Sequence, residues 1–290
     1  MIGRACRNRG LRARDLLQSS TLDRCALQDI YLVCCGERSM SAIPKAAAAA
    51  ELLLLARRSA PLDRLPDGLG PVDAAEAYAI QDVVAERLGP VVGWKVGAAS
   101  IEAEPTAAPL LDGTILPSPA SLSSAAYAPL GVEAEIAFTL ARDLPAGASR
   151  SDAEAAIGAA HVVIEVCASR FSDWHAVDGL SKLADFNTNG ALVVGTAFDG
   201  WRDLEVSRQK VRLDFNDQTV IEQDGGNTAS DLLRLLVWLA GHAEGRGQPL
   251  AAGQVVTTGS WTGIRFVTPG TSVKAMFEGL GSAHVDFHLP

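Results

Sequence analysis

One strand-like run carries two acidic side chains on the same face. Residues 132–138 read Val-Glu-Ala-Glu-Ile-Ala-Phe, and the alternation of side chains along a β-strand places Glu133 and Glu135 together. The intervening positions are apolar, which indicates that the opposite face packs against a core. Because neighbouring like charges repel each other, this strand requires either a solvated surface or a cation that binds both carboxylates.

A third carboxylate lies in a second strand-like run. Residues 161–167 read His-Val-Val-Ile-Glu-Val-Cys, with Glu165 where valine would be expected if packing were the only requirement. Three carboxylates that converge from two strands form an oxygen-rich site of the kind that Mg²⁺ or Mn²⁺ prefers. The sequence therefore offers a metal site made by Glu133, Glu135 and Glu165 as the alternative to a solvated acidic face.

Composition and charge limit the partners of the chain. Its 290 residues are 48% apolar, so they can bury a sizeable core in one large domain or two small ones. The formal net charge of −9 argues against a nucleic-acid partner and against an anionic membrane surface. No apolar run approaches the ~20 residues that cross a bilayer, so we expect a soluble protein.

Residues 1–39 differ from the rest in charge and cysteine content. They hold seven arginines against four acidic residues, together with Cys6, Cys25, Cys34 and Cys35. Neither a paired C-x-x-C pattern nor the apolar stretch of a secretory signal occurs there. We interpret the segment as a disordered leader or an over-called start before Met40, in preference to a transit peptide. The remaining cysteine, Cys167, suits a reducing compartment, and we expect a cytoplasmic location.

Hydrophobic periodicity and capping residues predict helices mainly in the N-terminal third, with a helical region over residues 40–90. The expected helices are residues 45–58, a segment capped by Asp73 with Glu76 and closed by Gly89-Pro90, a segment starting with Ser151 and Glu154, and residues 232–240 capped by Ser230 or Thr228 and stopping at Gly241.

Strands dominate the C-terminal half. Besides the two acidic runs, the expected strands are residues 91–98, a hairpin of 211–215 and 218–222 across Asn216-Asp217, and residues 255–258, 272–277 and 283–288. This segregation of helices and strands favours an α+β fold over an alternating parallel sheet.

Several common catalytic motifs do not occur in the sequence. The five histidines show no H-E-x-x-H spacing, and there is no G-x-x-x-x-G-K-[ST] loop. Gly279-Leu280-Gly281 lacks the third glycine of a dinucleotide site and is interpreted as a turn. Ser260 does not lie in a G-x-S-x-G elbow.

Four short polar segments interrupt the apolar strands. They are G-W-K-V-G at 93–97, S-R-F-S-D-W at 169–174, A-D-F-N-T-N-G at 184–190 and T-T-G-S-W-T-G at 257–263. Taken singly, Lys95 is explained as a solvated strand residue, and Asp185 as a residue that caps backbone groups or meets a ligand. The last segment ends a strand with hydroxyl groups and free amides, which suit a carboxylate ligand.

The four segments occur in this order together with V-E-A-E-I, I-E-V-x-x-S-R-x-x-D-W and the closing F-E-G-L-G-S. In this combination they resemble the 2-keto-4-pentenoate hydratase family. That family belongs to the fumarylacetoacetate hydrolase superfamily, which includes 4-oxalocrotonate decarboxylases. The resemblance spans residues 93–287 and implies a mixed β-sandwich or β-roll core with flanking helices, so we assign residues 91–290 to one catalytic domain. The chain departs from the family at Phe186, where relatives commonly have asparagine, and at residues 226–229.

The resemblance also implies the site residues. Glu133, Glu135 and Glu165 would ligate Mg²⁺ or Mn²⁺. Lys95, near both cation and substrate, would be the catalytic residue, with a lowered pKa. The substrate-binding residues would be Ser169, Asp185, Gly259 and Ser260.

The implied activity is the addition of water to a 2-hydroxy-2,4-dienoate, which gives a 4-hydroxy-2-oxo acid in the catabolism of aromatic or related compounds. Decarboxylation of a 4-oxalocrotonate-type diacid is the nearest alternative. C–C hydrolysis of an acylpyruvate is less favoured because no histidine precedes His161. A non-catalytic accessory subunit is the remaining alternative. The family also implies a homo-oligomer, with a pathway decarboxylase or aldolase as a further partner.

Overall fold

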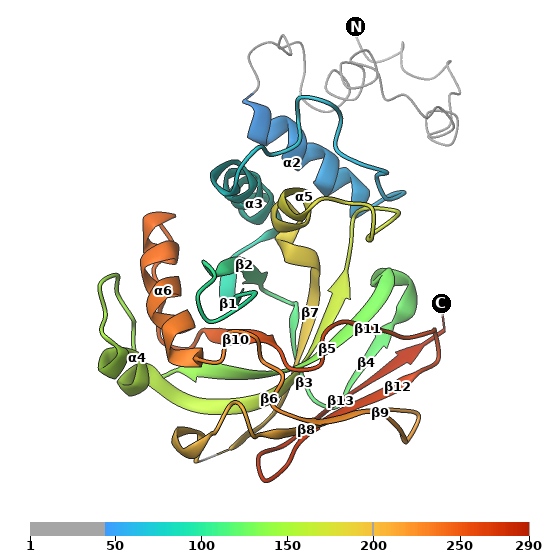
Figure 1. Ribbon diagram of the computed structural model, residues 1–290. Helices are drawn as coiled ribbons and strands as arrows, with labels where there is room; N and C mark the ends of the chain where they lie inside the picture. The colour runs from blue at the N-terminus through green and yellow to red at the C-terminus, as the bar shows by residue number, and fades with distance from the viewer. Residues whose placement is uncertain (1–43, 199, 290) are drawn as a thin grey trace, which may run out of the picture.

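Two β-sheets organise residues 44–198 and 200–289, which are the residues described by this computed structural model (Figure 1). The larger sheet has eight strands in the order β2-β1-β10-β5-β6-β7-β3, with β11 paired to β5. The smaller sheet has five strands in the order β4-β13-β12-β8-β9. The α+β class predicted from the sequence is confirmed. The prediction for residues 1–39 lies outside the described residues.

The elements have the following bounds. The strands are β1 Val91–Gly97, β2 Thr106–Leu111, β3 Ile115–Pro117, β4 Ala120–Ser123, β5 Pro129–Leu140, β6 Ile157–Ala168, β7 Asn189–Phe198, β8 Lys210–Phe215, β9 Gln218–Asp224, β10 Val255–Ser260, β11 Arg265–Phe266, β12 Ser272–Phe277 and β13 Gly281–His288. The helices are α2 Lys45–Ala56, α3 Ala74–Leu88, α4 Arg150–Ala156, α5 Gly179–Ala184 and α6 Leu232–Gly245, with 3₁₀ turns η2 Ser124–Ala126, η3 Phe186–Thr188 and η4 Trp201–Asp203.

The central strands β5 and β6 are buried on both faces. They pair antiparallel, and Glu133 lies directly opposite Glu165. The face of β5 that carries Ile136 and Phe138 packs into the main core, together with residues of β12 and β13 such as Phe277 and Phe287. The apolar side of the acidic strand therefore faces the smaller sheet, as the alternation of residues predicts.

A second hydrophobic cluster joins the N-terminal helices to the larger sheet. It contains leucines of α2, Ile80 and Val84 of α3, Ala108 and Leu111 of β2, and Phe186 of η3. Figure 1 shows α2, α3 and α5 gathered at one end of the molecule, away from the strands of the smaller sheet. Among the described residues, no helix is both long and apolar enough to cross a lipid bilayer.

Several predicted boundaries are confirmed and two helix starts are wrong. Asp73 caps α3, and the turn residues Asn216 and Asp217 both have positive φ, at 49° and 63°, as a tight hairpin requires. Helix α4 begins with a capping box of Ser149 and Asp152, two residues before the predicted one. Helix α6 is capped by Asp231, whose carboxylate accepts the backbone N–H of Arg234.

Helix α6 also continues past Gly241, where the sequence predicted its end. Ala243, one turn beyond Leu239, is fully buried, and the interior glycine costs only about 1 kcal/mol. The hydroxyl of Thr228, a predicted cap, instead donates to the carbonyl of Ala98 at 2.6 Å. Sequence analysis did not identify strands β2, β3, β4, β7 and β11 or helix α5. Strand β7 is largely buried and begins within a polar segment.

Candidate active site

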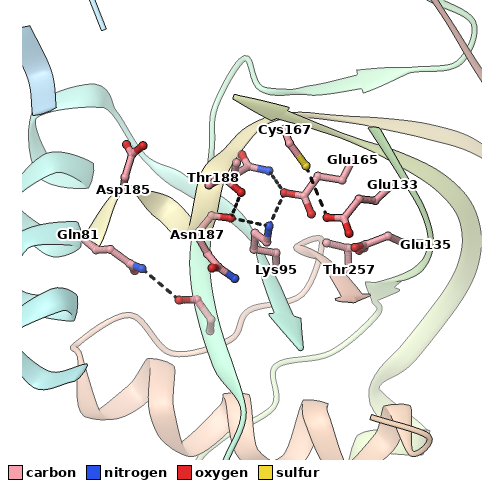
Figure 2. Close-up of polar contacts among 12 residues, drawn as sticks. Gln81, Lys95, Glu133, Glu135, Glu165, Cys167, Asp185, Asn187, Thr188 and Thr257 are labelled. Carbon is pink, nitrogen blue, oxygen red and sulfur yellow. Dashed lines mark hydrogen bonds and ion pairs between the residues drawn. The ribbon is translucent and has the colours of Figure 1, made fainter. Parts of the chain in front are cut away.

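Glu133, Glu135 and Glu165 meet on one face of the larger sheet (Figure 2). One carboxylate oxygen from each lies within 4.8 Å of the others. Glu135 and Glu165 are only 1% and 0% exposed, so the alternative of a solvated acidic face is excluded. The convergence has a local cause: Glu133 and Glu165 are opposite partners in the β5–β6 ladder, and Glu135 is the next same-face residue of β5.

The electrostatics of this carboxylate triad favour a bound cation. Burial, and then repulsion by Glu165, raise the pKa of Glu133. The same causes raise the pKa of Glu135 well above its ordinary value, although the hydroxyl of Thr257 donates to its carboxylate. Within the described part of the chain, Oε2 of Glu165 is buried without a hydrogen-bond partner. Two buried carboxylates and one half-buried carboxylate, with one oxygen unpaired, are costly alone and fit an oxygen-seeking divalent ion.

Lys95 provides the positive charge beside the triad. Its Nζ donates to Oε1 of Glu165 at 2.5 Å and to the carbonyl of Asn187 at 3.0 Å, and its side chain is 11% exposed. The same Glu165 oxygen accepts the side-chain amide of Asn189 at 2.9 Å. β1 carries Lys95 to this position by parallel pairing with β10, opposite Thr257.

The pKa of Lys95 was predicted to be lowered beside a bound cation, and in the metal-free protein it moves in the opposite direction. Burial alone would lower the pKa of Lys95, but attraction to Glu165 and then to Cys167, Glu133 and Glu135 outweighs burial and raises it. Lys95 is therefore an ammonium group at neutral pH. It can donate hydrogen bonds and protons but is not a free base.

A left-handed turn holds the carbonyl that Lys95 contacts. Phe186, Asn187 and Thr188 have φ values of 56°, 49° and 63°, and none of them is glycine. Each such residue costs roughly 1–2 kcal/mol, so the surrounding packing must hold the turn. Phe186 is 2% exposed, and the Arg57 guanidinium lies 4.9 Å from its ring centroid. The sequence signal for this turn was weak, being limited to the asparagines at 187 and 189.

Gly259 and Ser260 lie at the β10 end of the triad. Ser260 is the register partner of Glu135, and a hydrogen bond from its hydroxyl partly offsets the pKa rise of Glu133. Gly259 has φ 86°, which favours glycine, and its carbonyl accepts the side-chain amide of Asn227 at 3.0 Å. The predicted carboxylate-binding segment is therefore next to the metal-binding candidates.

Cys167 is a site neighbour that sequence analysis did not assign to the site. Its Sγ lies 3.5 Å from Oε2 of Glu133, and burial raises the pKa of its thiol well above the usual range. Its place follows from its being two residues beyond Glu165 on the same strand face. Thr257 was within a predicted segment, but its contact with Glu135 depends on the β5–β10 pairing and was not predicted.

The structure does not bring Asp185 to the triad. Its carboxylate accepts the backbone N–H of Arg170 at 2.9 Å and the Arg170 guanidinium, and Arg57 lies 3.8 Å away. Figure 2 shows it pointing away from the triad. These contacts are those of a positioning residue that anchors the strained turn. Ser169 accepts the backbone N–H of Phe171 at 3.1 Å, and its contact with a substrate remains a prediction.

Replacing Asp185 with alanine should lower the free energy of unfolding by about 3–5 kcal/mol, because two buried guanidinium groups lose their carboxylate. Urea denaturation followed by circular dichroism measures the change. As a control, Asp67→Ala removes a carboxylate whose side chain is 95% exposed, and it should leave the midpoint unchanged. Equal midpoints for the two variants would contradict the anchoring role.

Comparison with known proteins places this chain in a family. Residues 95–287 match the family described as fumarylacetoacetate (FAA) hydrolase C-terminal. A 2-keto-4-pentenoate hydratase of Burkholderia vietnamiensis is 32% identical over 80% of this chain and 91% of its own. A protein of the same name from Paraburkholderia xenovorans is 28% identical over 82% of this chain and 93% of its own.

A solved structure shares the fold. The 4-oxalocrotonate decarboxylase from Pseudomonas putida G7, complexed with magnesium and adipate, has a TM-score of 0.74. It is 23% identical, with 84% of this chain and 97% of that chain covered. The resemblance to 2-keto-4-pentenoate hydratases inferred from the motifs is thus confirmed, and the chain belongs to the fumarylacetoacetate hydrolase family.

Proposed function

We propose that the protein is a metal-dependent hydratase that converts a 2-hydroxy-2,4-dienoate into a 4-hydroxy-2-oxo acid. The observation that carries the proposal is the largely buried triad, with its unpaired Glu165 oxygen and the adjacent Lys95 ammonium. Glu133, Glu135 and Glu165 would hold Mg²⁺ or Mn²⁺. The names of the two bacterial relatives support the substrate class.

The reaction sets requirements that the residues of the chain meet. Hydration places the hydroxyl of water on carbon 4, leaves a ketone at carbon 2, and delivers protons to carbons 3 and 5. A bound divalent cation would supply Lewis acidity towards the carboxylate and the 2-oxygen of the substrate. Lys95, held as an ammonium by Glu165, is suited to donate a proton and to stabilise developing negative charge.

The segment that ends β10 is suited to bind the carboxylate of the substrate. Gly259 and Ser260 present a backbone amide and a hydroxyl beside the triad, and Asn227 holds the chain there through the carbonyls of Thr258 and Gly259. Fixed donors of this kind orient a carboxylate without reorganisation during the reaction. Cytoplasmic location, homo-oligomeric assembly and a separate complex with a pathway decarboxylase or aldolase are further parts of the proposal.

A metal-depletion assay tests the function. We expect protein treated with EDTA to be inactive on 2-hydroxypenta-2,4-dienoate, and added Mg²⁺ or Mn²⁺ to restore the loss of ultraviolet absorbance. The same assay on 2-oxo-3-hexenedioate, with CO₂ measured separately, tests the decarboxylase alternative. CO₂ release that matches the absorbance loss would favour a decarboxylase. Tight Mn²⁺ binding without turnover of any dienoate would favour an accessory subunit.

A further inference from the structure

The two oxygens of the Glu165 carboxylate have different surroundings. Oε1 accepts hydrogen bonds from Nζ of Lys95 at 2.5 Å and from Nδ2 of Asn189 at 2.9 Å. Oε2 is buried and has no hydrogen-bond partner in the part of the chain that the structure describes. Figure 2 shows this carboxylate between Lys95 and Glu133. Protein donors therefore occupy one oxygen, and only the other is free for a ligand.

A β-bulge brings Asn189 to the face of the sheet that carries the triad. Val166 of β6 pairs with Ala191 of β7. The next residue of β6, Cys167, pairs with Asn189, so Gly190 is an extra residue on β7. In a regular ladder, Gly190 would lie opposite Cys167, and Asn189 would point to the opposite face. Bulges of this kind occur next to active sites, where they redirect a side chain.

The surroundings of the bulge hold Asn189 in place. A Cβ on Gly190 would lie 2.8 Å from the carbonyl oxygen of Val166, so no side chain fits there. The Arg170 guanidinium donates to the carbonyl of Asn189 at 3.2 Å. Asn189 itself is only 4% exposed. Its amide is therefore a fixed donor to Glu165, and water does not compete for this contact.

We propose that Asn189 is a positioning residue that, together with Lys95, leaves Glu165 one free oxygen for the cation. This inference rests on the metal site of the proposed function. Ca²⁺ takes more oxygen ligands than Mg²⁺ and often binds a carboxylate through both oxygens, whereas Mg²⁺ requires a nearly ideal octahedron. A Glu165 with a single free oxygen therefore favours Mg²⁺ over Ca²⁺.

Asn189→Leu tests this role, because it keeps the approximate size of the side chain and removes the donor. Metal-free protein is titrated with Mn²⁺ while electron paramagnetic resonance follows the free ion, and Mg²⁺ and Ca²⁺ are measured by competition. We expect the dissociation constants for Mg²⁺ and Mn²⁺ to rise about 10–100-fold, the range typical of a lost contact to a metal ligand. The constant for Ca²⁺ should change by less than about threefold, since Ca²⁺ tolerates irregular coordination and can use both oxygens.

A matched pair isolates the donor from the packing. Asn189→Ser and Asn189→Ala both shorten the side chain and differ only in a hydroxyl group, which can donate to Oε1 directly or through one water. The serine variant should keep the preference for Mg²⁺ over Ca²⁺, and the alanine variant should lose it. Gln254→Leu is the control: the Gln254 amide donates to the carbonyl of Val91 at 3.4 Å, immediately before β10, and its loss should change none of the constants.

The outcomes separate this role from the proposed activity, because the titrations need no substrate. Equal losses for all three ions in both Asn189→Leu and Asn189→Ala, or no loss for any, would overturn the positioning role. Equal affinity of the unaltered protein for Mg²⁺ and Ca²⁺ would overturn the restriction on Glu165. An unaltered protein with the expected ion preference that hydrates no dienoate would refute the hydratase function and still support the role of Asn189. A protein that binds none of these ions would refute both.

Discussion

Replacing Glu135 with glutamine should abolish turnover and stabilise the metal-free protein. Glu135 is buried beside two other carboxylates, so the amide removes repulsion and desolvation cost while it also removes a candidate metal ligand. We expect kcat/KM with Mn²⁺ to fall at least about a thousandfold, which corresponds to about 4 kcal/mol. In EDTA, the melting temperature should rise rather than fall. Steady-state kinetics and calorimetry measure the two effects.

The stabilisation should depend on pH with a definite sign. Below the ordinary glutamic acid pKa of 4.5, the Glu135 carboxyl is protonated in both the folded and the unfolded chain, and the substitution changes little. As the pH rises towards the raised folded-state pKa, the unfolded chain loses the proton that the folded protein retains. The metal-free parent protein therefore loses stability, and the glutamine variant does not share this loss.

The control for this variant is Glu102→Gln, at an exposed position, which should change neither activity nor melting temperature. Added Mn²⁺ should raise the melting temperature of the parent protein and of the control, but not that of Glu135→Gln. Near-normal metal-dependent turnover in Glu135→Gln would show that this carboxylate is not a ligand.

Lys95→Met should separate metal binding from chemistry. The substitution keeps a long apolar stem but removes the ammonium that donates to Glu165 and to the carbonyl of Asn187. We expect kcat to fall by about 10²–10⁴-fold, the range typical of a lost general acid. Mn²⁺ affinity should be retained or increased, because a positive charge next to the site is gone. Kinetics and electron paramagnetic resonance of free Mn²⁺ measure the two properties.

Lys95→Arg is the informative companion of that variant. It keeps the charge, but the planar guanidinium does not fit a buried position defined by two short contacts from one nitrogen, so activity should stay low.

The metal-free Lys95→Met variant should also be less stable by about 3 kcal/mol or more, since a buried carboxylate loses its partner. Turnover within tenfold of the parent, or loss of Mn²⁺ binding, would contradict the role given to Lys95.

The triad was predictable because its geometry is local. Side-chain alternation places Glu133 and Glu135 on one face, and an isolated acid among valines marks Glu165 as a residue that packing does not explain. The hairpin turn at Asn216-Asp217 was predictable for a similar reason, since its conformation depends on two adjacent residues.

The remaining features depend on contacts between distant segments. The carboxylate of Asp185 is held by Arg57 and Arg170, and no spacing rule pairs these residues. In the metal-free protein, the pKa of Lys95 depends on four neighbours from two other strands, so its direction could not be derived from the local sequence. Helix α6 continues past its predicted end because the burial of Ala243 outweighs the low helix propensity of Gly241.

The turn at Phe186–Thr188 ties the N-terminal helices to the reaction centre. Arg57, at the end of α2, lies over the ring of Phe186, and Gln81 of α3 donates to the carbonyl of Leu183 at 2.5 Å. Residues far from the carboxylate triad in sequence thus hold the backbone that presents the Asn187 carbonyl to Lys95. Removing the chain before residue 90 would remove these contacts. Substitutions in α2 or α3 should therefore reduce catalysis before they unfold the protein.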